Sequence, residues 1–105
     1  MKLIPQELRE QIPHLYSTEE QSDPLVHVKL FTPDADWSFF ITEISIDDNI
    51  CFGLVISPFV PNGELGYFSV EELSSVRGKL GLPIERNKWF KATTLSNVKR
   101  KYCEN

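Results

Sequence analysis

The stretch of this chain that most constrains its fold is residues 64–86, ELGYFSVEELSSVRGKLGLPIER. Residues 65–68 are strand-prone, and they follow the turn-forming triplet Pro-Asn-Gly at residues 61–63. Gly66 interrupts this apolar run, and a missing side chain inside a strand indicates a bulge or a close backbone neighbour. The pattern therefore predicts a strand that starts after a tight turn and leads directly into the next element.

That next element is a short capped helix. Ser69 and Glu72 have the spacing of a capping box, in which each side chain accepts a hydrogen bond from the backbone N–H of the other residue. An apolar stripe with a spacing of three residues follows, formed by Val70, Leu73 and Val76. Gly78 is a natural left-handed stop. These signals agree on a helix at about residues 70–77.

Three further segments have the composition of strands. Residues 25–31, 37–46 and 50–56 are rich in β-branched and aromatic residues, and turn-forming residues separate them. Alternation along the second segment assigns Trp37, Phe39 and Ile41 to one face and Phe40, Thr42, Ile44 and Ile46 to the other. The third segment, ICFGLVI, is apolar on both faces, as expected of a central strand that is buried on both sides of the sheet. Such short connections favour an antiparallel meander.

The N-terminal residues 3–12 predict another helix. Pro5 suits the first helical position, and Pro13 disfavours helical geometry at the residue before it. An apolar residue recurs at every fourth position, at Ile4, Leu8 and Ile12. This amphipathic helix is expected to pack on the sheet that follows it.

The expected fold class is therefore α+β. It combines a small antiparallel meander sheet of three to four strands with the two helices packed on one face. Residues 1–98 are expected to form a single domain. Residues 99–105 are expected to form a basic C-terminal tail that is frayed.

Length and composition are those of one soluble globular domain. The chain has 105 residues, of which 41% are hydrophobic and 25% charged. No apolar run approaches the roughly 20 residues needed to span a bilayer. The N-terminus, MKLIPQELRE, lacks the apolar region of a signal peptide, and Cys51 and Cys103 form no paired motif. A reduced cytoplasmic protein is the resulting expectation.

Charge is distributed unevenly along the chain. Residues 1–72 contain thirteen acidic and three basic residues, which gives −10, and residues 73–105 contain two acidic and eight basic residues, which gives +6. The two parts sum to the net charge of −4. This asymmetry predicts either two faces of one domain that attract each other or two surfaces for different partners.

No residue set carries the signature of a catalytic, metal or cofactor site. Oxygen ligands suited to a hard cation occur at Thr32, Asp34, Asp36 and Glu43. Their spacing is not that of an EF-hand, and acidic turn residues commonly bind their own backbone. His14 and His27 have no neighbouring nucleophile with an orienting carboxylate, and Cys51 is expected to be a small buried hydrophobe. We therefore predict no catalytic residue, no bound metal and no cofactor.

A set of polar residues is expected at the edge of the sheet: Lys29, Glu43, Tyr67, Arg77, Glu85 and Arg86. In a meander, Lys29 and Glu43 would face each other across neighbouring strands. The set predicts either a salt-bridge network that ties the C-terminal segment to the sheet or a site for a ligand or partner.

Two charged surfaces are candidates for binding a macromolecule. The acidic one is a proposed protein-binding face made of Asp34, Asp36, Glu43, Asp47 and Asp48. The basic one interleaves cations with an aromatic residue and consists of Lys88, Trp89, Lys91, Lys99, Arg100 and Lys101. The basic composition is typical of nucleic-acid-binding surfaces, although the acidic remainder of the chain would repel phosphates.

Several blocks of the sequence resemble a family of small single-domain bacterial proteins of unknown function. They are LIPQELREQIPHLYSTEEQ, VHVKLFTPDADWSFFITE, CFGLV, ELGYFSVEELSSVRGKLGLPIER and WFKATTLSNV, which together extend over residues 3–98. The stretch SPFVPNGELGY differs from the shorter, more acidic version in that family, and the final KRKYCEN lies outside the resemblance. The resemblance implies an origin on plasmids, conjugative elements and phages, alongside anti-restriction and transfer genes, and implies no known activity.

Three functions are compatible with these observations. The first is a non-enzymatic accessory protein of mobile DNA that binds another protein through its acidic face, with inhibition of a host defence system as one form. The second is a nucleic-acid-binding module that uses the basic aromatic region. The third, favoured least, is a small enzyme with a polar pocket around Lys29, Glu43, Tyr67 and Arg77.

Overall fold

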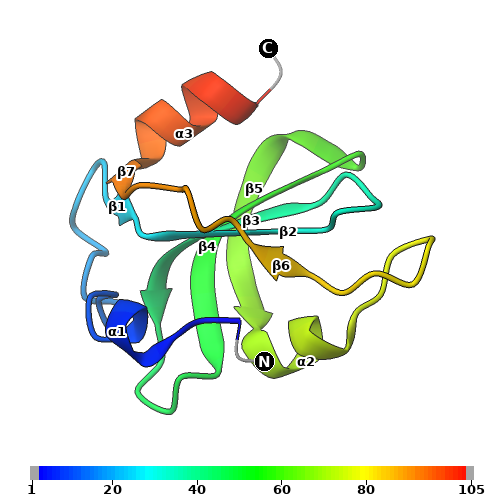
Figure 1. The fold of residues 1–105 in the computed structure, drawn as a ribbon. Helices are drawn as coiled ribbons and strands as arrows, with labels where there is room; N and C mark the ends of the chain where they lie inside the picture. Colours follow the sequence, from blue (N-terminus) through cyan, green and yellow to red (C-terminus); the bar gives the residue numbers. More distant parts are fainter. Residues whose placement is uncertain (1–2, 104–105) are drawn as a thin grey trace.

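The computed structural model describes residues 3–103 and has an α+β fold (Figure 1). Its main sheet has five antiparallel strands in the order β5-β4-β3-β2-β6, and a second sheet pairs β1 with β7. The strands are β1 Leu25–Val26, β2 Val28–Phe31, β3 Ser38–Ile44, β4 Ile50–Ser57, β5 Val60–Ser69, β6 Glu85–Arg86 and β7 Thr93–Thr94. The helices are α1 Gln6–Arg9, α2 Val70–Ser75 and α3 Leu95–Tyr102.

The predicted α+β class and antiparallel meander are confirmed, and the sheet is larger than expected. Strands β2 to β5 form the meander, and β6 adds a fifth strand beside β2. The expected strand over residues 25–31 is broken at His27, so that β1 pairs with β7 instead of joining the main sheet. A third helix, α3, follows β7 and adds to the two helices that the sequence predicted.

Apolar side chains cover both faces of the central strand β4, as the sequence predicted. One cluster contains Ile41, Cys51 and Leu73 and lies on the side of α1 and α2. The other contains Phe40, Leu54 and Val98 and lies under α3. Figure 1 shows α3 on one side of the sheet and the two shorter helices on the opposite side. Burial on two faces is therefore what holds the sheet between its helices.

A β-bulge in β3 changes the face assignment that strict alternation predicted. The pairing register with β4 shifts between Ile41 and Glu43, so that Thr42 is the extra residue. Ile44 consequently joins Phe39 and Ile41 in the cluster on the α1 side, instead of sharing a face with Phe40. Glu43 moves to the face of Phe40, and the Thr42 hydroxyl donates to the Phe52 carbonyl at 3.0 Å.

The N-terminal helix is shorter than the predicted residues 3–12. α1 begins after Pro5, and the buried residues Ile4 and Ile12 lie outside it. The Arg9 side chain explains this geometry, because it donates to the Ile4 carbonyl at 3.0 Å and pairs with Asp48 at 2.9 Å. These contacts hold the chain against the β3–β4 turn, where a longer straight helix would not follow the core.

The second helix begins where the sequence predicted and ends earlier. The Ser69 hydroxyl accepts a hydrogen bond from the Glu72 N–H at 3.2 Å, which confirms the N-cap. The helix ends at Ser75 because Val76 is extended, with ψ 139°. Gly78 is not left-handed. A Cβ at this position would lie 1.6 Å from Asp34 Oδ1, so glycine is needed here to leave space for the Asp34 carboxylate.

Two further expectations about the chain path are corrected. The turn before β5 is at residues 58–59, and residues 61–63 lie inside β5, where Gly63 has a φ of +83°. The tail expected to be frayed over residues 99–105 is helical as far as Tyr102, because Tyr102 packs on Phe40 with ring centroids 5.0 Å apart. Residues 104–105 lie outside the described part.

Gly53 and Gly66 are cross-strand partners, and they have opposite tolerance for a side chain. A Cβ at Gly53 would lie 1.8 Å from the Phe40 carbonyl oxygen, whereas a Cβ at Gly66 would have no heavy atom within 4 Å. The close backbone neighbour that the sequence assigned to Gly66 is therefore at Gly53. We predict that Gly53→Ala lowers the free energy of unfolding by more than about 3 kcal/mol.

The matched variant Gly66→Ala is the control. It should leave the free energy of unfolding unchanged or raise it by about 0.4–1 kcal/mol, since alanine restricts the unfolded chain. Urea denaturation of both variants measures the difference. Equal stabilities would show that β3 and β4 do not approach each other in this way at Gly53.

Candidate functional site

The proposed acidic face does not form one surface. Asp34 and Asp36 precede β3, whereas Asp47 and Asp48 follow it, so the two pairs lie at opposite ends of the strand. These carboxylates are also largely used within the fold. Asp34 accepts from the N–H groups of residues 80 and 82 at 2.7 and 3.3 Å, Asp47 accepts from Ser45, and Asp48 pairs with Arg9. Asp34, Asp47 and Asp48 therefore act mainly as turn and loop stabilisers.

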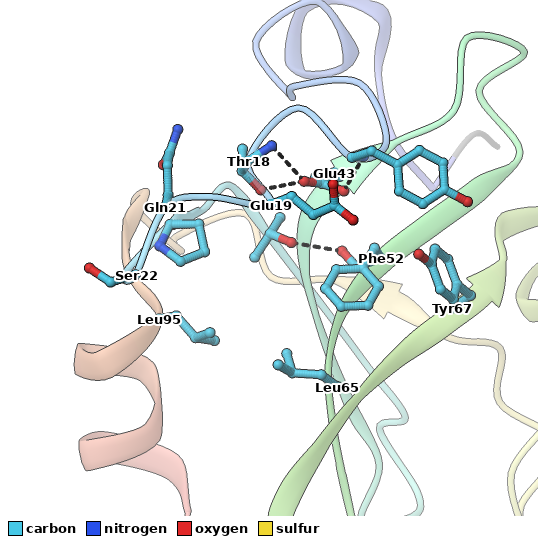
Figure 2. A pocket seen from close by; sticks show the side chains of 12 residues that line it. Thr18, Glu19, Gln21, Ser22, Glu43, Phe52, Leu65, Tyr67 and Leu95 are labelled. Atoms are coloured by element: carbon cyan, nitrogen blue, oxygen red, sulfur yellow. Dashed lines mark hydrogen bonds between the residues drawn. The ribbon is translucent and has the colours of Figure 1, made fainter.

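Glu43 is the member of that set that the structure places at a cavity. Its side chain is only 4% exposed and lies on the α3 face because of the bulge. One carboxylate oxygen accepts from the Tyr16 N–H at 2.8 Å, and the other accepts from the N–H of Thr18 at 2.9 Å and from its hydroxyl (Figure 2). Burial of this charge is compensated by three donors, which hold the loop before β1 over the sheet.

The cavity beside Glu43 has a volume of about 300 Å³ and lies between this loop, β5 and the start of α3. Its lining residues are Tyr16, Thr18, Glu19, Gln21, Ser22, Pro24, Thr42, Glu43, Phe52, Leu65, Tyr67 and Leu95. Figure 2 shows Glu19 next to Glu43, with Phe52 and Tyr67 lying side by side on neighbouring strands. The lining thus contains two carboxylates and three aromatic rings, and it contains no lysine or arginine.

The aromatic rings of the cavity are in mutual contact. The centroid of Tyr67 lies 4.9 Å from that of Phe52 and 6.4 Å from that of Tyr16. Tyr67 is 55% exposed, so its ring faces solvent at the mouth of the cavity. The nearby Tyr16 hydroxyl is the main cause that raises the pKa of Tyr67 above its usual value, and desolvation and the Glu43 and Glu19 carboxylates add to the effect. The mouth of the cavity is therefore aromatic and negatively charged.

The predicted polar set is divided between two regions: Glu43 and Tyr67 share one cavity, whereas Glu85 and Arg86 line one hollow with Lys29 and another with Arg77. Lys29 lies opposite Phe40 rather than Glu43, and its Nζ is 4.5 Å from the centre of the Tyr102 ring. Burial lowers the pKa of Lys29, and the nearby Lys101 lowers it further. Arg77, Glu85 and Arg86 line a different cavity of about 800 Å³, and Tyr67 lies at the cavity of Glu43. An enzyme pocket built on Lys29, Glu43, Tyr67 and Arg77 is therefore not formed.

The six residues of the predicted basic surface fall into two groups. Lys88, Trp89, Lys91 and Lys101 line two adjoining hollows on one side of α3. Lys99 and Arg100 lie near Asp23, whose pKa is lowered mainly by hydrogen bonds from Ser96 and further by these two cations. Trp89 is 89% exposed. Four of the six predicted residues therefore share one surface, and two do not.

Other titratable residues do not assemble into a site within the described residues. No group of three or more His, Cys, Asp or Glu side chains that could hold a metal ion occurs among residues 3–103. Cys51 is fully buried, as predicted, and burial raises the pKa of its thiol to about 12. Burial also lowers the pKa of His27, at the break between β1 and β2.

Comparison with known proteins places the chain in a family. It belongs to the DUF2958 family, described as a protein of unknown function, and the match extends over residues 3–101. Searches of curated proteins and of solved structures found no match. Within residues 3–103, every helix is too short or too polar to span a membrane.

Sequence reasoning identified Glu43 and Tyr67 but missed their neighbours at the cavity. Thr18 and Glu19 lie in a polar stretch that reads as an ordinary surface loop, and Tyr16 has no motif around it. The backbone of Tyr16 does mark the site in the structure. Its φ of +71° is left-handed, which is uncommon for a bulky residue. That strain is maintained by the Glu43 carboxylate, which lies far away along the chain.

Replacement of Glu43 by glutamine tests whether this carboxylate holds the loop. The amide has one oxygen, so at least one of the three donors from Tyr16 and Thr18 would face an NH₂ group. We predict that Glu43→Gln lowers the free energy of unfolding by about 1–3 kcal/mol. Hydrogen exchange should also accelerate at the amides of residues 16 and 18. Chemical denaturation and NMR exchange measure the two effects.

The exposed Glu64 on β5 supplies the matched control, since it has the same chemistry in solvent. Glu64→Gln should change the free energy of unfolding by no more than about 0.5 kcal/mol. Unchanged stability and exchange in Glu43→Gln would contradict a structural role for the buried carboxylate.

Proposed function

We propose that this protein is a non-enzymatic accessory protein that binds a basic segment of another protein. Protein binding is the mode of action that the sequence suggested, and we place it at the cavity of Glu43 instead of at the acidic turns. The observation that carries it is the composition of that cavity, which combines three aromatic rings and two carboxylates without a cation. This composition is complementary to a lysine or arginine side chain.

Two interactions would act together on such a side chain. A cation over the rings of Tyr67, Phe52 or Tyr16 gains about 0.5–1 kcal/mol at an exposed site and more when water is excluded. The exposed Glu19 carboxylate is the free partner for an ion pair, because Glu43 already accepts three hydrogen bonds. The guanidinium of arginine suits this arrangement well, since it both stacks on rings and pairs with carboxylates.

The edge strand β5 offers a way to align the rest of the segment. β5 is at one end of the main sheet, and an edge strand presents unpaired N–H and C=O groups to an incoming chain. Leu65 and Tyr67 are exposed on β5 at the cavity. An extended basic segment could therefore pair with β5 while it places one side chain in the cavity. Pro61, earlier in β5, has no N–H and limits pairing there.

The setting implied by the family resemblance belongs to the same proposal. On plasmids, conjugative elements or phages, a protein that binds basic segments would meet host enzymes that handle nucleic acid, which commonly have basic surfaces. Inhibition of a host defence protein is one form of such binding. Its support is the resemblance together with the electronegative cavity, through electrostatic complementarity.

Replacement of Tyr67 tests the proposed cavity. A photo-crosslinking residue is placed at Leu65, and the purified protein is incubated with bacterial lysate in the presence of nuclease. We predict a discrete crosslinked protein whose yield falls about 2- to 5-fold in Tyr67→Ala, as expected from the loss of an exposed cation–π contact. Glu19→Gln should lower the yield at low salt and have less effect at high salt.

Phe59→Ala is the control, because Phe59 is an exposed aromatic residue at the β4–β5 turn that does not line the cavity. Its crosslinking yield should equal that of the unmodified protein. A partner captured equally well by Tyr67→Ala, or a crosslinked segment without lysine or arginine, would contradict the proposed mode of binding.

A further inference from the structure

Trp89 is held in an exposed position by the backbone around it. Its N–H donates to the Asn87 side-chain oxygen at 2.9 Å, and the Asn87 N–H donates to the Lys29 carbonyl at 2.9 Å. The next residue, Phe90, packs toward Phe40, with ring centroids 6.2 Å apart. The backbone of Trp89 is therefore fixed at the tip of a short turn between β6 and β7, while Phe90 anchors that turn to the core. An exposed side chain on an anchored turn is suited to contact a partner.

Hollows lie on both sides of this indole. One of about 450 Å³ extends from Trp89 to α3, and the other, of about 430 Å³, extends from Trp89 to the end of β2. Trp89 and Asn87 line both, so they form the wall between them. Each volume is within the range of about 300–1,000 Å³ that is typical of ligand sites. A planar group on either side of the indole would find space beside an aromatic surface.

The charged side chains around the two hollows are mostly cationic. Lys91 and Lys101 line the first, and Lys29, Arg86 and Lys88 line the second, together with one carboxylate, Glu85. The single salt bridge within residues 3–103 joins Arg9 to Asp48, so these five cations have no ion pair with a described carboxylate. This is a local positive surface on a chain with a net charge of −4.

We propose that the surface around Trp89 binds single-stranded nucleic acid. A base stacks on the indole, the adjoining hollows accept its neighbours, and the lysines contact phosphates. The exposed aromatic face favours this ligand over an acidic protein segment, which would satisfy the cations and leave the indole unused. It also favours a single strand over a duplex, whose bases already stack on one another. This site is separate from the cavity of Glu43, and the inference does not depend on the proposed function.

Binding of oligothymidylate of about 12 nucleotides, which is within the usual site size of roughly 4–16 nucleotides, tests the inference. The protein carries Trp37→Phe, so that Trp89 is the sole indole. We predict quenching of the Trp89 fluorescence on binding. In a labelled-oligonucleotide assay, Trp89→Ala should weaken the affinity about 5- to 150-fold, and Trp89→Phe should recover part of the loss.

The salt dependence of binding tests the lysine contacts. For single strands, the logarithm of the binding constant falls with the logarithm of salt concentration, with a slope of about −0.7 per phosphate contacted. Lys91→Gln combined with Lys101→Gln should therefore make the slope about 1.4 less negative. Lys79→Gln, at an exposed lysine outside both hollows, should leave the slope unchanged.

Two control variants test whether binding is specific to the surface around Trp89. Phe59→Ala removes an equally exposed aromatic residue elsewhere, and Tyr67→Ala alters the other proposed site, so both should bind oligothymidylate normally. The inference is overturned if no oligonucleotide binds at low salt, if Trp89→Ala binds as well as the unmodified protein, or if poly-glutamate binds with equal affinity. Circular dichroism of Trp89→Ala confirms that it folds, so that a loss of binding is interpretable.

Discussion

The extra residue in β3 determines how the rest of this structure is arranged. Thr42 shifts the register with β4, and every side chain after it changes face. Without the shift, Glu43 would point into the apolar cluster on the α1 side, where a carboxylate would have few donors. With it, Glu43 faces the loop before β1 and accepts three hydrogen bonds. One backbone irregularity thus decides where the buried charge, and with it the loop, can lie.

The uneven charge of the chain has a structural explanation. Several carboxylates of the acidic part are occupied as acceptors of backbone and hydroxyl groups, among them Asp23, Asp34, Glu43 and Asp47. The cations around Trp89 have no ion pair among the described residues. A carboxylate can accept from the local backbone in a turn, whereas lysine has only donors and a long flexible stem, so it remains at the surface. Several carboxylates are therefore held in turns and loops of the fold, whereas the cations around Trp89 are available to a partner.

Helix α3 separates the two proposed binding surfaces. Leu95 lines the cavity of Glu43, whereas Asn97, Val98, Lys101 and Tyr102 line a hollow beside Trp89, so no residue of the helix lines both. The helix is itself anchored by Thr94, whose hydroxyl accepts from the Asn97 N–H at 3.3 Å, and by the burial of Val98. The two proposed sites therefore share no side chain of α3.

The sequence by itself determined the elements whose signals are local. The Ser69 cap, the apolar pattern of β4 and the order of β2 to β5 follow from neighbouring residues and short turns, which act through near contacts. The tertiary structure decided the features that depend on distant residues. The bulge at Thr42, the helical end of the chain on Phe40 and the meeting of Tyr16 with Glu43 all join segments far apart in sequence. No local pattern encodes such meetings, because they follow from register and packing across the whole sheet.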